Sequence, residues 1–170
     1  MKRYALDDLR KWKEAPNRKP LILRGARQVG KTELVRMFAR ECFESFIEIN
    51  FDEHPSKISF FEEEDIGTLC KYIEIDTGIK LVPGKTLLFL DEIQSVPQVL
   101  ARLRYFYERM PGLHVICAGS LLDFALADHE ISMPVGRMEF MFLGPMTFGE
   151  FLNAREHPQI EEYLAGYQIG

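Results

Sequence analysis

The first residues whose types and spacing can do chemistry lie between Gly25 and Thr32, where the sequence reads GARQVGKT. This matches the pattern G-x-x-x-x-G-K-[ST], in which glycines let backbone N–H groups turn inward around phosphate oxygens. An apolar run at Leu21–Leu23 precedes it and an amphipathic segment follows from Gly30, which is the strand–loop–helix context that the pattern requires. The residues that we expect to cradle phosphate are Gly25, Ala26, Arg27, Gln28, Val29, Gly30, Lys31 and Thr32.

Two side chains at the end of this loop are expected to act on a nucleoside triphosphate. Lys31 would reach the β- and γ-phosphates and assist catalysis, and Thr32 would place its hydroxyl on Mg²⁺. The helix that follows offers its unpaired N-terminal amides and the positive end of its dipole to the same anion. The alternative is a glycine-rich turn that only caps a helix, but the spacing and the flanking elements favour phosphate binding.

A pair of acids at the end of a later strand points to hydrolysis. The run LLFLDE is apolar from Leu87 to Leu90 and ends in Asp91 and Glu92. Side chains at the carboxyl end of a parallel strand emerge where ligands of such sheets bind. We expect Asp91 to hold Mg²⁺, directly or through water, and Glu92 to act as the general base on the attacking water. The alternative is a strand end that merely faces solvent.

Two further candidates stand next to other predicted strands. Ser120 follows the apolar run VICAG, where its hydroxyl can contact the γ-phosphate or the attacking water; it can equally be the N-cap of a helix. Arg137 precedes the run EFMF, and its guanidinium can reach a neighbouring protomer's site and stabilise transition-state charge. A local ion pair with an acid such as Glu139 is the alternative for Arg137.

Three polar residues close to these motifs have less definite roles. Arg27 and Gln28 lie at the crown of the loop, where they contact either a partner or only solvent. Gln94, in the run DEIQ, can orient water.

Apolar strands alternate with amphipathic helices along the chain, and this order positions the candidates. Runs that are apolar on both faces indicate a parallel sheet covered by helices on both sides, whereas the alternating FIEIN run is typical of an edge strand. The strands are predicted at Leu21–Leu23, Phe46–Asn50, Leu87–Leu90, 114–119 and 139–144. Helices are predicted at 4–13, from Gly30 to Cys42, at 66–75 behind an acidic loop, from Pro97 to Met110, and from Phe148 onward.

Composition limits the class of protein. The chain has 170 residues, is 46% hydrophobic and carries a net charge of −5, which fits one globular domain and argues against binding nucleic acid by bulk electrostatics. Three scattered cysteines without a CxxC pair fit a reducing cytoplasm, and the histidines show no zinc-ligand spacing. No apolar run is long enough for a membrane span. The chain also lacks an NKxD guanine selector and an LSGGQ stretch, which counts against a GTPase and an ABC transporter subunit.

Four stretches together resemble the AAA+-type ATPase domain of a prokaryotic family of predicted ATPases. They are LRGARQVGKTELV, LLFLDEIQ, CAGSLL and VGRMEFMFLGPMTFGEF. The resemblance implies a three-layer α/β P-loop NTPase fold with a five-stranded parallel sheet of order 5-1-4-3-2, and it places Arg137 near the arginine finger of related proteins. It also implies a core at 1–145, the start of a C-terminal helical region at 146–170, and a nuclease-like C-terminal domain that this chain does not include.

The function expected from these residues is Mg²⁺-dependent hydrolysis of ATP. A nucleotide-binding switch with little turnover is the alternative from another class, and a small-molecule kinase is a third possibility. Beyond ATP, the expected partners are further copies of the chain or a protein client. Whether nucleic acid is a partner stays open, and no membrane partner is expected.

Overall fold

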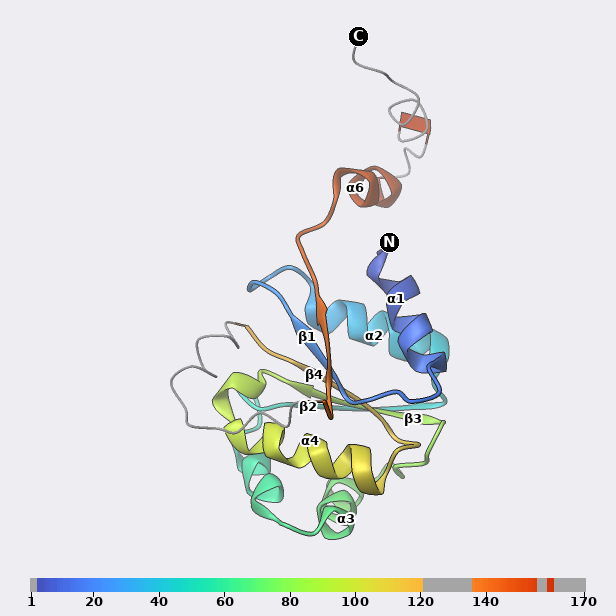
Figure 1. Cartoon of the computed structure of the whole chain (residues 1–170). Coiled ribbons are helices and arrows are strands. Elements are labelled where there is room, and N and C mark those ends of the chain that lie inside the picture. Colours follow the sequence, from blue (N-terminus) through green and yellow to red (C-terminus); the bar gives the residue numbers. More distant parts are fainter. Residues whose placement is uncertain (1–2, 121–135, 156–158, 161–170) are drawn as a thin grey trace.

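The computed structural model describes residues 3–120, 136–155 and 159–160 of the 170-residue chain. Its centre is a parallel sheet of five strands in the order β2-β3-β4-β1-β5 (Figure 1). Counted from the other edge this is the predicted order 5-1-4-3-2, so the predicted fold is confirmed. The strands are β1 (Leu21–Arg24), β2 (Ser45–Asn50), β3 (Thr86–Asp91), β4 (His114–Ala118) and β5 (Glu139–Phe142).

The hydrophobic pattern of each strand agrees with its place in the sheet. β3 and β4 are buried along their whole length because both of their faces are apolar and both are covered. β2 and β5 are the edge strands, and their residues alternate in burial along much of each strand. The predicted edge position of the FIEIN run is therefore confirmed.

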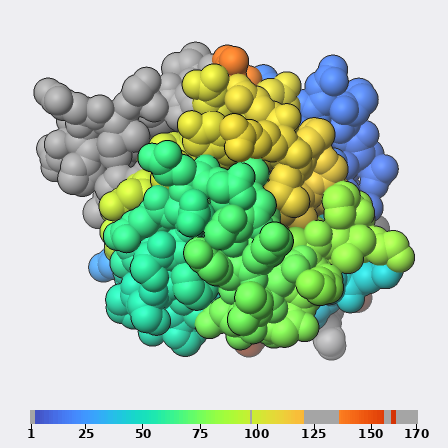
Figure 2. Space-filling view, turned by 90° about the horizontal axis from the view of Figure 1, so that it is seen from below, coloured from blue at the N-terminus to red at the C-terminus, as the bar shows by residue number. Residues whose placement is uncertain are grey.

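Helices cover both faces of this sheet. They are α1 (Ala5–Glu14), α2 (Lys31–Cys42), α3 (Ile66–Thr77) and α4 (Pro97–Arg109). Apolar residues of α1 and α2 form one core with alternate strand residues such as Leu23 and Phe89. The intervening strand residues, such as Ile22 and Leu88, form a second core with α3 and α4. Figure 2 views this second layer from below, where α3 and α4, in green and yellow, form one continuous surface.

The segment between β2 and β3 was the least clear part of the sequence. It holds the 3₁₀ helix η1 (Pro55–Glu62) and then α3, so the predicted helix in this segment is confirmed. Asp65 starts α3 as its N-cap, because its Oδ2 accepts a hydrogen bond of 2.8 Å from the backbone N–H of Thr68. The acidic residues just before this cap form the loop that the sequence predicted.

The chain leaves β5 and reaches a short helix, α6 (Phe148–Ala154), that lies near the start of α1 (Figure 1). Thr147 begins α6 with a capping box, in which its side chain and that of Glu150 each accept a backbone N–H. Within the described ranges, none of the helices has the length and apolarity that spanning a bilayer requires.

Candidate nucleotide-binding site

The loop from Gly25 to Gly30 joins β1 to α2, and its two glycines are required by geometry. Gly25 has a φ of +148°, and a Cβ added there would lie 2.3 Å from the carbonyl oxygen of Leu143. Gly30 has a φ of +91° and forms the N-cap of α2. Residues with a side chain rarely adopt such angles, so glycine is strongly favoured at both positions, and at Gly25 the close approach of Leu143 also excludes a Cβ.

Lys31 is the first residue of α2, and its ammonium turns back into the loop. Its Nζ donates hydrogen bonds to the carbonyl oxygens of Gly25 at 2.8 Å and Ala26 at 2.9 Å. Burial lowers the pKa of this ammonium, and the charges of Glu92 and Asp91 oppose that effect. A buried cation that rests on neutral carbonyls is well prepared to receive an anion, because the anion would offset its desolvation.

Thr32 and Asp91 bring the loop and the third strand together. The Thr32 hydroxyl donates to Asp91 Oδ2 over 2.7 Å, although the two residues are 59 positions apart in the sequence. Asp91 ends β3 and is only 2% exposed. Burial raises the pKa of its carboxyl, while the hydrogen bond from Thr32 acts in the opposite direction. The predicted phosphate loop and the predicted acid pair therefore lie together at the carboxyl ends of the strands.

Glu92 follows in a strained conformation. Its φ of 57° lies in the left-handed region, which is uncommon for residues with a side chain and is often found at functional sites. Its Oε2 accepts a hydrogen bond of 2.6 Å from Gln94 Nε2. The other amide atom of Gln94, Oε1, is buried and has no hydrogen-bond partner among the described residues. Gln94 thus holds the candidate base and leaves one acceptor free for a further donor such as water.

Lys31, Thr32 and Glu92 line a common pocket of about 370 Å³. Its lining consists of Arg27, Gln28, Gly30, Lys31, Thr32, Glu33, Arg36 and Glu92. Arg27 and Gln28 are exposed at the loop crown, as the sequence analysis placed them, and Gln28 also has a positive φ of 63°. Apart from Gly30, the lining residues are all charged or polar in type, which suits a phosphate chain.

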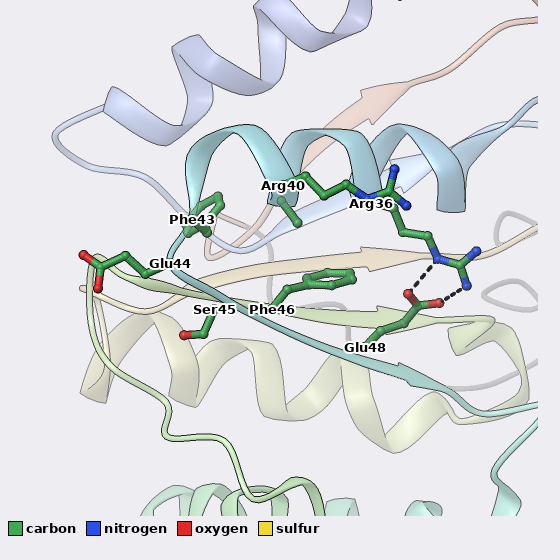
Figure 3. A pocket seen from close by; sticks show the side chains of 8 residues that line it. Arg36, Arg40, Phe43, Glu44, Ser45, Phe46 and Glu48 are labelled. Atoms are coloured by element: carbon green, nitrogen blue, oxygen red, sulfur yellow. Dashed lines mark hydrogen bonds and ion pairs between the residues drawn. The ribbon is translucent and has the colours of Figure 1, made fainter. Parts of the chain in front are cut away.

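Arg36 lines this pocket too, and sequence reasoning missed it. It lies on α2 four positions after Thr32, so helical spacing alone places both side chains on one face. Its guanidinium makes two hydrogen bonds with Glu48 of β2, Nε to Oε2 at 2.8 Å and Nη2 to Oε1 at 2.6 Å (Figure 3). Arg36 also lines a second pocket, of about 400 Å³, between the end of α2 and β2.

A third pocket, of about 420 Å³, adjoins the other side of the loop. It is lined by Arg3, Arg27, Gln28, Val29, Gly30, Pro145 and Met146. Arg3 had no role in the sequence analysis, and the connection after β5 entered it only as part of a family resemblance. Both reach the phosphate loop in space, and the loop therefore has open pockets on two sides.

Ser120 and Arg137 lie in different places relative to the loop. Ser120 is 3% exposed and follows β4 at the same end of the sheet as Asp91. The helix that Ser120 would cap under the alternative interpretation lies outside the described residues. Arg137 precedes β5 and so lies at the opposite end of the parallel sheet from Asp91. Within its own chain Arg137 is therefore not brought to the phosphate loop.

The predicted local ion pair of Arg137 exists, but with a different acid. Arg137 Nε lies 3.2 Å from Glu108 Oε1 of α4, and Glu108 also pairs with Arg104. Glu139 instead accepts a hydrogen bond from the backbone N–H of Lys19. The expectation that named Glu139 was wrong because the last turns of α4 approach Arg137, an arrangement that depends on tertiary packing.

The side chains fit a magnesium nucleotide by their chemistry. Within the described part of the chain no cluster of three or more His, Cys, Asp or Glu residues could hold a metal ion by itself. The site instead offers one carboxylate, from Asp91, beside one hydroxyl, from Thr32. This is the donor set expected for Mg²⁺, which takes one or two protein ligands and completes its shell with phosphate oxygens and water.

Comparisons with known proteins agree with this geometry. The profile of a protein family described as "AAA domain" matches residues 17–152. A search of curated proteins found no match. Among solved structures, the Orc1 protein of Aeropyrum pernix in complex with DNA is 16% identical, with a TM-score of 0.58 over 95% of this chain and 50% of its own. ORC of Drosophila bound to DNA is 15% identical, with a TM-score of 0.57 over 94% of this chain and 47% of its own.

The chain spans about half the length of these two solved proteins, and at such low identity they show a shared fold and no more. The family match is broader, since it covers most of the chain, including the loop, both acids and the start of α6. This chain belongs to the AAA domain family.

Proposed function

We propose that this chain binds ATP with Mg²⁺ at the carboxyl edge of its sheet and hydrolyses it. The observation that supports this most strongly is the 2.7 Å hydrogen bond from Thr32 Oγ1 to Asp91 Oδ2. It joins the phosphate-binding loop to the acidic strand end, so the groups that bind phosphate and those that would activate water share one pocket. Phosphoryl transfer needs mainly positioning and charge stabilisation, and these residues supply both.

Each residue has a defined task in this proposal. The loop amides and Lys31 bind the β- and γ-phosphates, and Lys31 gives up its carbonyl partners in the loop to do so. Thr32 and Asp91 hold the magnesium ion, which when bound neutralises phosphate charge. Glu92 accepts a proton from the attacking water, whose oxygen forms a bond to the γ-phosphorus as the bond to ADP breaks.

Two candidate catalytic residues have conditional roles. Ser120 is proposed to contact the γ-phosphate or the water, because it lies at the same end of the sheet as Asp91. Arg137 is proposed to act only on the site of a second copy, since its own sheet separates it from its own loop. Its ion pair with Glu108 is partly exposed, so the guanidinium is accessible to a neighbouring subunit.

One observation favours a second candidate, a nucleotide-dependent switch with little turnover. Glu92 Oε2 accepts a hydrogen bond of 2.6 Å from Gln94, so this oxygen is less available to an attacking water. In that case bound ATP would persist and act through the contacts that it changes.

Turnover and binding, measured together, separate the candidates. Wild type is expected to bind ATP and release inorganic phosphate, whereas Glu92→Gln should bind ATP equally well and release phosphate at least about a hundredfold more slowly. Equal, slow turnover by both proteins with tight binding would establish the switch. If the γ-phosphate of the ATP is labelled, label that appears on an added acceptor instead of in inorganic phosphate would indicate a kinase. Each assay is run with and without DNA, because both solved relatives are DNA complexes.

A further inference from the structure

A buried ion pair joins the two ends of the described chain. Arg3 Nε lies 3.2 Å from Glu150 Oε1, and the two side chains are only 5% and 4% exposed. They are 147 positions apart in the sequence. Because removing two charges from water is costly, such a pair persists only where the remaining donors and acceptors also find partners.

The guanidinium of Arg3 places its remaining donors on two other segments. Its Nη1 donates to the carbonyl oxygen of Val29 in the phosphate loop over 3.0 Å, and its Nη2 donates to the carbonyl oxygen of Gly144 over 3.1 Å. One planar group therefore connects the N-terminal segment, the phosphate loop and the connection after β5. Arginine suits this task because its donors form a rigid fork, whereas the ammonium of lysine is a single point.

Both oxygens of the Glu150 carboxylate accept hydrogen bonds. Its Oε1 also accepts the backbone N–H of Tyr4 at 2.8 Å, and its Oε2 accepts the backbone N–H of Thr147 at 2.8 Å. The Thr147 contact is half of the capping box that begins α6. The same side chain thus starts α6 and binds Arg3, so α6 cannot move away from the loop without breaking the pair.

The contact with Val29 has a direct consequence for anion binding. A carbonyl group and the N–H of the next residue belong to one planar peptide unit, so fixing one fixes the direction of the other. Holding the oxygen of Val29 on Arg3 therefore sets the direction of the N–H of Gly30, one of the amides proposed to bind phosphate. A second tie lies nearby, where the backbone N–H of Leu143 donates to the carbonyl of Arg24 at 2.8 Å, immediately before the loop.

We propose that Arg3 is a positioning residue for the phosphate loop, and that the Arg3–Glu150 pair couples occupancy of this loop to α6. The proposal rests on the proposed function, because it assigns the loop to the phosphates of ATP. Linkage makes this coupling reciprocal. If a partner that displaces α6 changes the affinity for nucleotide by some factor, nucleotide changes the affinity for that partner by the same factor.

The test compares Arg3→Lys with wild type and with Arg10→Lys as the matched control. Arg10 also ties α1 to another element, through its ion pair with Glu41 of α2, but it is half-exposed and does not touch the loop. Arg3→Lys keeps a cation beside Glu150 and loses the fork. We expect a Kd for ATP about tenfold higher than that of wild type, and no change for Arg10→Lys.

Hydrogen exchange measures the positioning and the coupling separately. In the free protein, Arg3→Lys should raise the exchange rate of the loop amides at 26–31, an effect that needs no nucleotide. In wild type, ATP should slow exchange in α6, and in Arg3→Lys this slowing should be lost. A lower melting temperature with unchanged Kd and unchanged loop exchange would show that the pair only supports the fold, and would overturn the proposal.

A second variant and a measurement without nucleotide cover the cases in which Arg3→Lys does not fold or wild type does not bind ATP. If Arg3→Lys does not fold, the double variant Arg3→Met/Glu150→Gln replaces it, because neither residue then leaves a buried charge without its partner. The same rise in loop exchange is expected there, and its absence would contradict the proposal. If wild type does not bind ATP, the proposed function fails, whereas the loop exchange of the free protein still decides whether Arg3 positions the loop.

Discussion

The hydroxyl of Thr32 and the carboxylate of Asp91 form a 2.7 Å hydrogen bond where α2 begins and β3 ends. This contact is possible because β1 and β3 are parallel strands of one sheet, separated by β4, so their carboxyl ends point the same way. The loop after β1 therefore meets the acids after β3.

Lys31→Met should weaken ATP binding without harming the fold. The ammonium of Lys31 is buried against loop carbonyls and forms no ion pair with an acid among the described residues. Burial also lowers its pKa, so we expect that its charge is not needed for stability. We expect the Kd for ATP to rise by about a hundredfold, as for the loss of a charge-assisted contact with phosphate, with a melting temperature equal to or above that of wild type. Fluorescence titration and thermal unfolding measure the two effects, and retained affinity would remove Lys31 from the site.

Chelation of magnesium should weaken binding only while Asp91 is present. In wild type, EDTA is expected to raise the Kd for ATP by about tenfold, since Thr32 and Asp91 would hold the ion and the ion would neutralise phosphate charge. Asp91→Asn offers a neutral amide that binds the ion poorly, so its Kd should be the same with and without EDTA. Calorimetric titration under both conditions provides the measurement. If the variant responds to EDTA as strongly as wild type, Asp91 is not the metal ligand.

Gly25→Ala should destabilise the fold by at least about 2 kcal/mol. A Cβ at Gly25 would lie 2.3 Å from the carbonyl oxygen of Leu143, and the φ of +148° adds backbone strain. Gly144→Ala is the control, because nothing lies within 4 Å of a Cβ added there and its φ is ordinary. Denaturant unfolding of both variants compares the free energies. Equal free energies of unfolding for Gly25→Ala and Gly144→Ala would mean that the connection after β5 leaves room for a Cβ at position 25.

His114 should make the protein less stable in acid. Its ring is 4% exposed and lies against Trp12 and Phe43, with ring centroids 5.8 Å and 4.8 Å away. Burial lowers the pKa of His114 to about 4 from 6.5, so the unfolded chain takes up a proton first as the pH falls. The stability contributed by the neutral ring is complete above pH 6.5 and is lost between pH 6.5 and 4, up to about 3 kcal/mol.

His114→Phe tests this titration, because phenylalanine keeps the ring and removes the proton site. Urea unfolding at pH 7 and at pH 4 should show a loss of stability that is about 3 kcal/mol smaller in the variant than in wild type. An identical loss in both proteins would mean that other groups cause the acid sensitivity.

Local patterns in the sequence pointed to much of the candidate site. The loop from Gly25 to Thr32 is one continuous motif whose glycines and flanking elements encode its shape directly. Asp91 was predicted because, in a chain that also has such a loop, an apolar strand that ends in acids has few other interpretations. The sheet order came from the resemblance to a known family, since strand periodicity alone does not order strands.

Contacts between distant, ordinarily exposed residue types escaped sequence reasoning. Arg3 and Glu150 are 147 positions apart, and both residue types are rarely buried, so neither suggested a partner. Arg36 was closer to recognition, because helical spacing from Thr32 points to it, but its bond to Glu48 depends on the neighbouring edge strand. The choice of Glu108 as the partner of Arg137 likewise depends on how α4 packs.

The most direct test of the central claim is a crystal structure of the chain with Mg²⁺ and a non-hydrolysable ATP analogue. The account predicts that the β- and γ-phosphates lie in the loop at 25–32, with Lys31 on them. It also predicts that the magnesium ion is held by the Thr32 hydroxyl and, directly or through one water, by Asp91. An analogue bound elsewhere, or a metal ion that contacts neither residue, would contradict it.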